Sequence, residues 1–172
     1  IDYARKIYAE AAKRELHCNF YIEDDINMAG MSELAEKYLA RLETKAHIIE
    51  DVEEFFKQHE DLTKITIQSY IPEDLDDFAA WIESSWPGEL YIVKSNPFFL
   101  EVSHPYANKG TGLAQIAEEY GFTREEVMCI GDNHNDLSMF AYSGLAVAMG
   151  NAEEEVKAKA DYVTATYLEN GV

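Results

Sequence analysis

Residues 129–136, which read CIGDNHND, combine side chains that can hold a metal ion. Two aspartates and two asparagines follow the apolar residues 127–130, which predict a buried strand. In open α/β sheets, ligands bind beyond the carboxyl ends of the strands, where this loop would lie. Its oxygen atoms suit Mg²⁺, which takes only one or two protein carboxylates. The alternative is that Asn135 and Asp136 merely cap the helix that follows.

A second segment places a lysine at a glycine-rich helix start. Asn108, Lys109, Gly110 and Gly112 open a predicted helix over about 110–120. Backbone N–H groups and positive charge meet at such a position, so the segment can hold a phosphate. The alternative is a lysine that is simply solvated.

A third segment, residues 146–152, reads AVAMGNA and predicts a strand of small residues. The strand ends at Gly150 and Asn151, where a glycine lets the backbone approach a site closely. The alternative is a strand, a turn and Asn151 as the N-cap of the next helix.

The elements that would position these segments follow two patterns. Residues 1–103 predict an α+β unit with a largely antiparallel sheet, with helices over 2–16, 32–43, 52–59 and 72–84 and strands over 17–22, 26–28, 64–70, 90–94 and 98–102. From Lys109 on, short apolar strands at 127–130, 145–149 and 162–164 alternate with helices at 110–120, 135–142 and 152–159, which indicates a parallel α/β sheet. We therefore predict two domains, 1–103 and 104–172.

The composition limits the partners that we expect. The 172 residues include 33 acids against 14 lysines and arginines, a net charge of −19 that repels nucleic acids and anionic membranes. The apolar runs are too short to span a bilayer and no signal peptide is visible, so we expect a cytoplasmic protein. Cys18 and Cys129 lie in apolar stretches and are expected to be buried free thiols.

Taken together and in this order, the three segments resemble the Cof-type branch of the haloacid dehalogenase (HAD) phosphatases. The resemblance rests on Lys109-Gly110, Gly131–Asp136, Ala148–Ala152, Ala160-Asp161 and the closing ENGV of residues 169–172. It is specific over 97–172, whereas residues 1–96 match only the pattern of the large cap that this branch inserts. It implies an α/β fold in which 104–172 is part of a Rossmann-like HAD core and 1–103 is an α+β cap domain.

The resemblance also implies a function and its residues. It implies a Mg²⁺-dependent phosphatase that hydrolyses small phosphorylated metabolites, such as sugar phosphates or phosphorylated cofactors, through an aspartyl-phosphate. Lys109 would neutralise the nucleophile and the phosphate, and Asp132 would bind the metal ion. Asn135 would contact the phosphate or order the loop, and Asp136 would orient Lys109 or a metal-bound water. Asn151 would line the site.

One part of the family pattern is not found in this chain. The nucleophile of the family lies in a D-x-D-x-T motif that precedes the cap, and a Ser/Thr phosphate motif also precedes it. The nearest candidate, residues 74–77 (DLDD), follows Pro72-Glu73 and is interpreted as an acidic helix start. We therefore expect a fragment that is inactive alone, whose exposed sheet edge favours a homodimer or another association.

Two alternatives to a phosphatase stay open. The chain could be a non-enzymatic module that binds a divalent cation for a regulatory purpose, or its parent could transfer phosphoryl groups as a mutase. For a cap that selects substrates, Tyr91, Lys94 and Asn96 are weak candidates.

Overall fold

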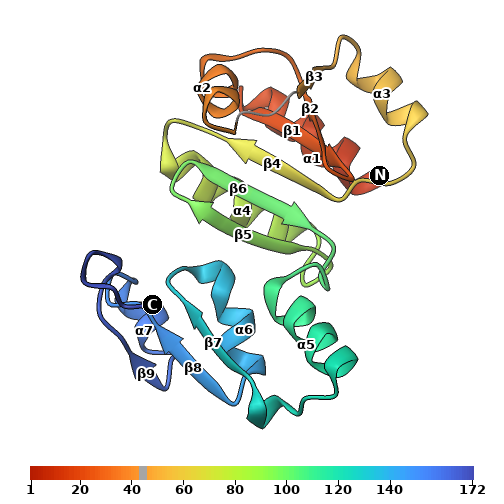
Figure 1. The fold of residues 1–172 in the computed structure, drawn as a ribbon. Helices are drawn as coiled ribbons and strands as arrows, with labels where there is room; N and C mark the ends of the chain where they lie inside the picture. The colour runs from red at the N-terminus through yellow and green to blue at the C-terminus, as the bar shows by residue number, and fades with distance from the viewer. Residues whose placement is uncertain (43–45) are drawn as a thin grey trace. The chain divides into compact units, whose positions relative to one another are not determined.

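The computed structural model describes residues 1–42 and 46–172, which divide into two compact units, Ile1–Pro105 and Tyr106–Val172 (Figure 1). Each unit has its own sheet and its own hydrophobic core. The predicted mixed α/β fold class is confirmed. The assignment of 1–103 as a cap and 104–172 as part of a catalytic core stays a prediction. Within the described ranges, no helix has the length and apolar character needed to cross a membrane.

The first unit is built on a six-stranded sheet of order β3-β2-β1-β4-β6-β5, in which only the β2–β3 pair is parallel. Its strands are β1 His17–Ile22, β2 Asp25–Met28, β3 Ala46–Ile48, β4 Lys64–Gln68, β5 Tyr91–Asn96 and β6 Phe99–Ser103. Its helices are α1 Asp2–Lys13, α2 Glu33–Leu42, α3 Val52–Gln58 and α4 Pro72–Ser85. The last residue of the helix predicted over 32–43 lies outside the described residues, and β3 was not predicted.

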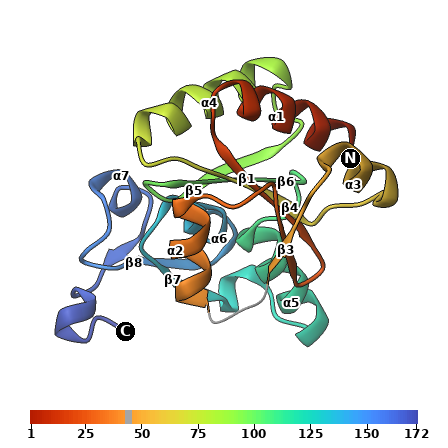
Figure 2. The ribbon, with the colours of Figure 1, turned by 90° about the horizontal axis from the view of Figure 1, so that it is seen from above.

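Helices cover the two faces of this sheet unequally. Figure 2 shows α1 and α4 side by side on one face and α2 on the other. Because side chains alternate along a strand, Phe20, Ile67 and Leu100 point into the core beneath α1 and α4. The opposite face carries polar side chains, among them the fully buried Asn19 and Gln68.

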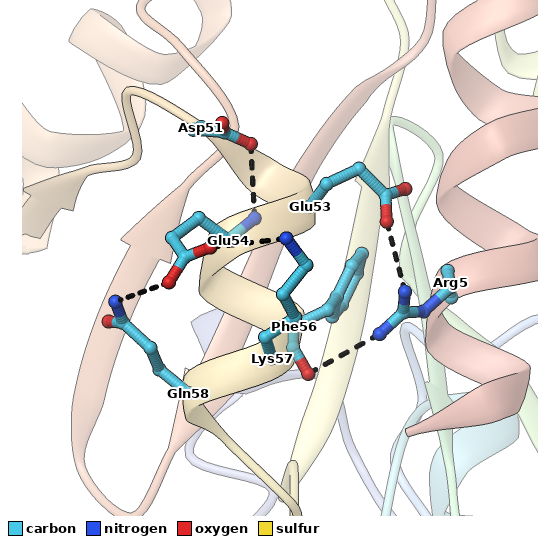
Figure 3. Close-up of polar contacts among 7 residues, drawn as sticks. All are labelled: Arg5, Asp51, Glu53, Glu54, Phe56, Lys57 and Gln58. Carbon is cyan, nitrogen blue, oxygen red and sulfur yellow. Dashed lines mark hydrogen bonds and ion pairs between the residues drawn. The ribbon is translucent and has the colours of Figure 1, made fainter.

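The short helix α3 is fixed to α1 by one arginine (Figure 3). Arg5 of α1 forms an ion pair with Glu53 at 3.0 Å and donates to the backbone carbonyl of Phe56 at 3.4 Å. The Phe56 ring is buried in the core and lies 5.5 Å from the guanidinium carbon. At the start of α3, the side chain of Asp51 accepts the backbone N–H of Glu54. A helix of seven residues is too short to be stable alone, so these contacts hold it.

Helix ends follow the residues that the sequence offers. Pro72 occupies the first turn of α4, where its missing N–H costs no hydrogen bond. Gly121 ends α5 (Lys109–Tyr120) in the left-handed conformation with a φ of 75°, as a C-terminal glycine does. Both features agree with the helix limits predicted from the sequence.

The second unit contains a parallel three-stranded sheet of order β7-β8-β9. Its elements are α5, β7 Met128–Gly131, α6 Leu137–Tyr142, β8 Leu145–Ala148, α7 Glu154–Lys157 and β9 Tyr162–Val163, with single 3₁₀ turns at Arg124–Glu126, His134–Asp136 and Tyr167–Glu169. The helix predicted over 135–142 begins with a 3₁₀ turn, because a capping box tightens its first residues. The helix predicted over 152–159 is shorter than expected.

The core beneath α4 predicts that two phenylalanines of the first unit contribute very differently to the free energy of unfolding. Phe78 is completely buried, whereas Phe98 is 42% exposed. We expect Phe78→Ala to lower the free energy of unfolding by about 3–5 kcal/mol and Phe98→Ala by about 1 kcal/mol or less. Urea denaturation followed by tryptophan fluorescence measures this unit alone, because Trp81 and Trp86 both lie in it. Equal losses would contradict the packing described.

Candidate functional site

Two loops of the second unit lie side by side at the carboxyl ends of β7 and β8. Gly131 pairs with Ala148 at the last position of the β7–β8 ladder. The backbone N–H of Met149 then donates to the carbonyl of Gly131 at 2.9 Å. The loop that begins at Asp132 and the loop that contains Asn151 therefore leave the same edge of the sheet, where open α/β sheets bind ligands.

The carboxylate of Asp136 joins the first loop to a lysine. Asp136 is 4% exposed, and its Oδ2 accepts the backbone N–H groups of Asp132 at 2.9 Å and Asn133 at 3.1 Å. Its Oδ1 accepts from Nζ of Lys109 at 2.5 Å. The alternative was that Asn135 and Asp136 merely cap the next helix. Asp136 does close the capping box of the 3₁₀ turn, but the same carboxylate also holds Lys109, and the N-cap of the turn is Asn133 and not Asn135.

Lys109 is the first residue of α5. The side chain of Asn108 caps this helix by accepting the N–H of Thr111 at 2.9 Å, and the N–H of Gly110 donates to Oγ of Ser138 at 3.0 Å. The Lys109 side chain keeps 49% of its surface exposed. Its ammonium group is thus oriented by Asp136 and still open to a ligand, beside the positive end of a helix.

Two glycines allow the backbones around Asp136 to come this close. A Cβ atom on Gly110 would lie 2.2 Å from the backbone oxygen of Ser138, so α5 could not pack on the start of α6. A Cβ atom on Gly131 would lie 2.4 Å from Cβ of Asp136. The glycines of the Lys-Gly and Gly-Asp segments therefore serve close packing around the ion pair.

Asn151 connects the two loops with the C-terminal turn. Its Nδ2 donates to Oδ2 of Asp132 at 3.1 Å, and its Oδ1 accepts the backbone N–H of Tyr167 at 3.2 Å. The alternative that Asn151 caps the next helix is wrong, because the N-cap of α7 is Glu153. Asn151 instead fixes one oxygen of an exposed carboxylate.

Asn135 has a side-chain oxygen without a hydrogen-bond partner. This Oδ1 atom is buried, and buried polar atoms are nearly always paired with protein, water or a ligand. The described residues contain no cluster of three histidine, cysteine, aspartate or glutamate side chains that could enclose a metal ion. A single exposed carboxylate at Asp132 still fits Mg²⁺, which takes only one or two protein carboxylates and keeps most of its waters.

Other candidate side chains are occupied elsewhere. The ring of His134 lies 3.4 Å from Glu153, so its nearest charged contact is outside the acidic loop. In the first unit, Lys94 forms an ion pair with Asp76 at 2.6 Å, and Asn96 accepts the backbone N–H of Phe98. Residues 74–77 lie near the start of α4, so they form an acidic helix start, as the sequence indicates.

Ser138 and Tyr167 were not predicted from the sequence, although both make hydrogen bonds that hold residues of the site. Ser138 holds the N-terminus of α5, and the N–H of Tyr167 holds Asn151. For Ser138 the only sequence signal is a hydroxyl two residues after Asp136. The contact of Tyr167 is made by its backbone, so its residue type carries no signal.

The close approach at Gly110 generates a test with a matched control. Gly110→Ala should lower the free energy of unfolding of the second unit by about 1–3 kcal/mol, because backbone must shift to admit the methyl group. Gly112→Ala meets nothing within 4 Å and should stabilise the helix by about 0.5–1 kcal/mol. Urea denaturation followed by NMR signals of residues 106–172 measures both. A neutral Gly110→Ala would contradict the described packing.

Comparisons with known proteins identify the family of this chain. Residues 2–172 match the family model for haloacid dehalogenase-like hydrolases. The 5-amino-6-(5-phospho-D-ribitylamino)uracil phosphatase YcsE of Bacillus subtilis is 49% identical over 84 residues, which are 49% of this chain and 34% of that protein. The putative phosphatase YxeH of the same organism is 42% identical over 101 residues, which are 59% of this chain and 37% of that protein.

Solved structures share the fold over nearly the whole chain. The HAD subclass IIB sugar phosphatase BT4131 superposes with a TM-score of 0.85 at 27% identity, covering 99% of this chain and 63% of that one. TM0651 from Thermotoga maritima gives a TM-score of 0.75 at 29% identity with the same two coverages, 99% and 63%. The chain thus spans less than two thirds of these proteins, and its predicted resemblance is confirmed. It belongs to the haloacid dehalogenase-like hydrolase family.

Proposed function

We propose that this chain is the cap and the C-terminal part of the core of a Mg²⁺-dependent phosphatase. Its relatives in the family are named phosphatases, but the aligned parts are 34% and 37% of the first two, so the activity of the whole protein is inferred. The observation that carries the proposal is the Lys109–Asp136 ion pair beside the exposed Asp132 at the end of β7. The nucleophilic aspartate would lie outside this chain.

Lys109 would neutralise negative charge during phosphoryl transfer. An aspartate that attacks a phosphate monoester brings two anions together, and a fixed ammonium group lowers that repulsion. Asp136 would hold the ammonium in place and, through its bonds to the backbone, hold the loop as well. Asn135 would contact the phosphate through its amide N–H groups, because its oxygen, like those of the phosphate, only accepts hydrogen bonds.

Asp132 would bind the Mg²⁺ ion. When bound, the ion would offset phosphate charge and polarise a phosphoryl oxygen. Asn151 would position Asp132, because its amide holds one carboxylate oxygen and leaves the other for the metal ion. The substrates would be small phosphate monoesters, as expected from relatives that include a ribitylaminouracil phosphatase and a sugar phosphatase.

Loss of the lysine or of the proposed metal ligand should nearly abolish turnover. In a polypeptide that joins this chain to the nucleophile segment, we expect Lys109→Ala and Asp132→Ala each to lower kcat for p-nitrophenyl phosphate at least about 100-fold. Lys159→Ala, an exposed lysine of the same unit, serves as the control and should retain activity. Full activity of both site variants would refute the assignment.

Assays of phosphate release also distinguish the phosphatase from the two alternative functions. A regulatory cation-binding module would bind Mg²⁺ without releasing phosphate from any monoester. A phosphotransferase parent would deliver the phosphoryl group to a second metabolite faster than to water. Release of inorganic phosphate as the main product supports the phosphatase.

The contact between Asn151 and Asp132 predicts an effect on metal binding. Asn151→Ala should weaken Mg²⁺ binding about 10- to 100-fold, the usual effect of removing a group that orients a metal ligand. Isothermal titration of the 172-residue chain measures this without turnover. Asn170→Gly is the control, since Asn170 is exposed and its φ of 58° suits glycine. Unchanged affinity in Asn151→Ala would contradict the positioning role.

A further inference from the structure

Residues 164–172, here called the C-terminal turn, are held in place by hydrogen bonds and not by buried side chains. Tyr167 and Leu168 at the centre of the turn are 67% and 79% exposed. The backbone N–H of Thr164 donates to the carbonyl of Ala148 at 2.9 Å, which ties the start of the turn to the end of β8. The position of the turn therefore depends on its polar contacts.

One carboxylate and one glycine close the C-terminal turn on itself. The carboxylate of Glu169 accepts the hydroxyl of Thr166 at 2.8 Å and the backbone N–H of the same residue at 3.3 Å, as in a capping box. The hydroxyl, and then the backbone N–H, lower the pKa of the Glu169 carboxyl, so it accepts both bonds as an anion at neutral pH. A Cβ atom on Gly171 would lie 2.0 Å from the backbone oxygen of Ala165, so this closure needs a glycine.

The closed turn determines which way the amide of Asn151 points. The backbone N–H of Tyr167 donates to Oδ1 of Asn151 at 3.2 Å. Because one end of an amide only accepts and the other end only donates, this bond directs Nδ2 to the opposite side. There Nδ2 donates to Oδ2 of Asp132 at 3.1 Å. An amide turned by 180° would instead place its oxygen against that carboxylate and repel it.

A second bond keeps the turn at this distance from the loop of Asn151. The backbone N–H of Gly150 donates to the carbonyl of Ala165 at 3.0 Å. A Cβ atom on Gly150 would lie 2.8 Å from the backbone nitrogen of Thr166, so the two backbones are in close contact. A change in the shape of the turn is therefore transmitted to Asn151.

We propose that Glu169 is a positioning residue for Asp132 and that the C-terminal turn thereby sets the affinity of the chain for Mg²⁺. The inference rests on the proposed function, in which Asp132 binds the ion. Glu169 acts through two intermediates, because it closes the turn and the turn orients the amide of Asn151. Without that closure Asp132 takes several orientations, and ordering them when the ion binds lowers the affinity.

The experiment compares Glu169→Ala with Glu169→Gln by isothermal titration of the 172-residue chain with Mg²⁺. Both variants remove the same negative charge, so the electrostatic effect on the cation is equal in the two. Glutamine keeps an oxygen that can accept both bonds from Thr166. We expect Glu169→Ala to bind Mg²⁺ about three- to tenfold more weakly than Glu169→Gln, less than the effect of losing a group in contact with a metal ligand. Leu168→Ala, at an exposed side chain of the turn, should keep the native affinity.

A double-mutant cycle tests whether Glu169 acts through Asn151. In chains that also carry Asn151→Ala, the alanine and glutamine variants of Glu169 should bind Mg²⁺ with equal affinity, because the connecting amide is gone. A role in stability alone would leave their difference unchanged. Circular dichroism of every variant shows that the chains compared are folded.

Two results would overturn this inference alone. One is equal Mg²⁺ affinity of folded Glu169→Ala and Glu169→Gln chains, and the other is a difference that persists without Asn151. Absence of Mg²⁺ binding, or binding that survives Asp132→Ala, would reject the metal assignment together with the inference. Expected affinities in a parent polypeptide that releases no phosphate would instead support the role of Glu169 and reject the catalytic assignment.

Discussion

The buried carboxylate of Asp136 is the constraint on which the candidate site depends. A carboxylate with 4% exposure is costly unless every oxygen is paired, and here each oxygen is. One oxygen holds the loop after β7 through two backbone N–H groups, and the other holds the ammonium of Lys109. The partners come from segments far apart in the chain, so a single side chain sets the distance between a cation and an acidic loop.

The ion pair requires close packing of the backbone around Asp136, which two glycines permit. Gly110 brings the start of α5 against Ser138, and Gly131 brings the end of β7 against Asp136. On the other side, Asn151 fixes Asp132 from the loop after β8. The site is therefore made of rigid elements whose loops are tied to one another, which suits a group that must keep its geometry while a ligand changes.

The sequence predicted the elements well wherever periodicity was long. Helices α1 and α4 were found near their predicted limits, because each buries an apolar face. Helix α5 and the three parallel strands also lie near their predicted limits, although both residues of β9 are exposed. Strand β3 was missed, since three residues carry no readable alternation. The segments that would meet at the site were visible as separate motifs. The hydrogen bonds of Asn151 with Asp132 and with the backbone of Tyr167 were not, because they join residues that only the tertiary fold brings together.

The arrangement of charges at Asp132 has a thermodynamic consequence. Lys109 supplies one positive charge, and Asp132 and Asp136 supply two negative ones, so an anion that arrives alone meets a site of net negative charge. A divalent cation on Asp132 reverses that sign. Under the proposed function, cation and phosphate ester would therefore bind with positive cooperativity, and each would raise the affinity of the other by the same factor. In so acidic a chain, the cation concentration would set the occupancy of the substrate site.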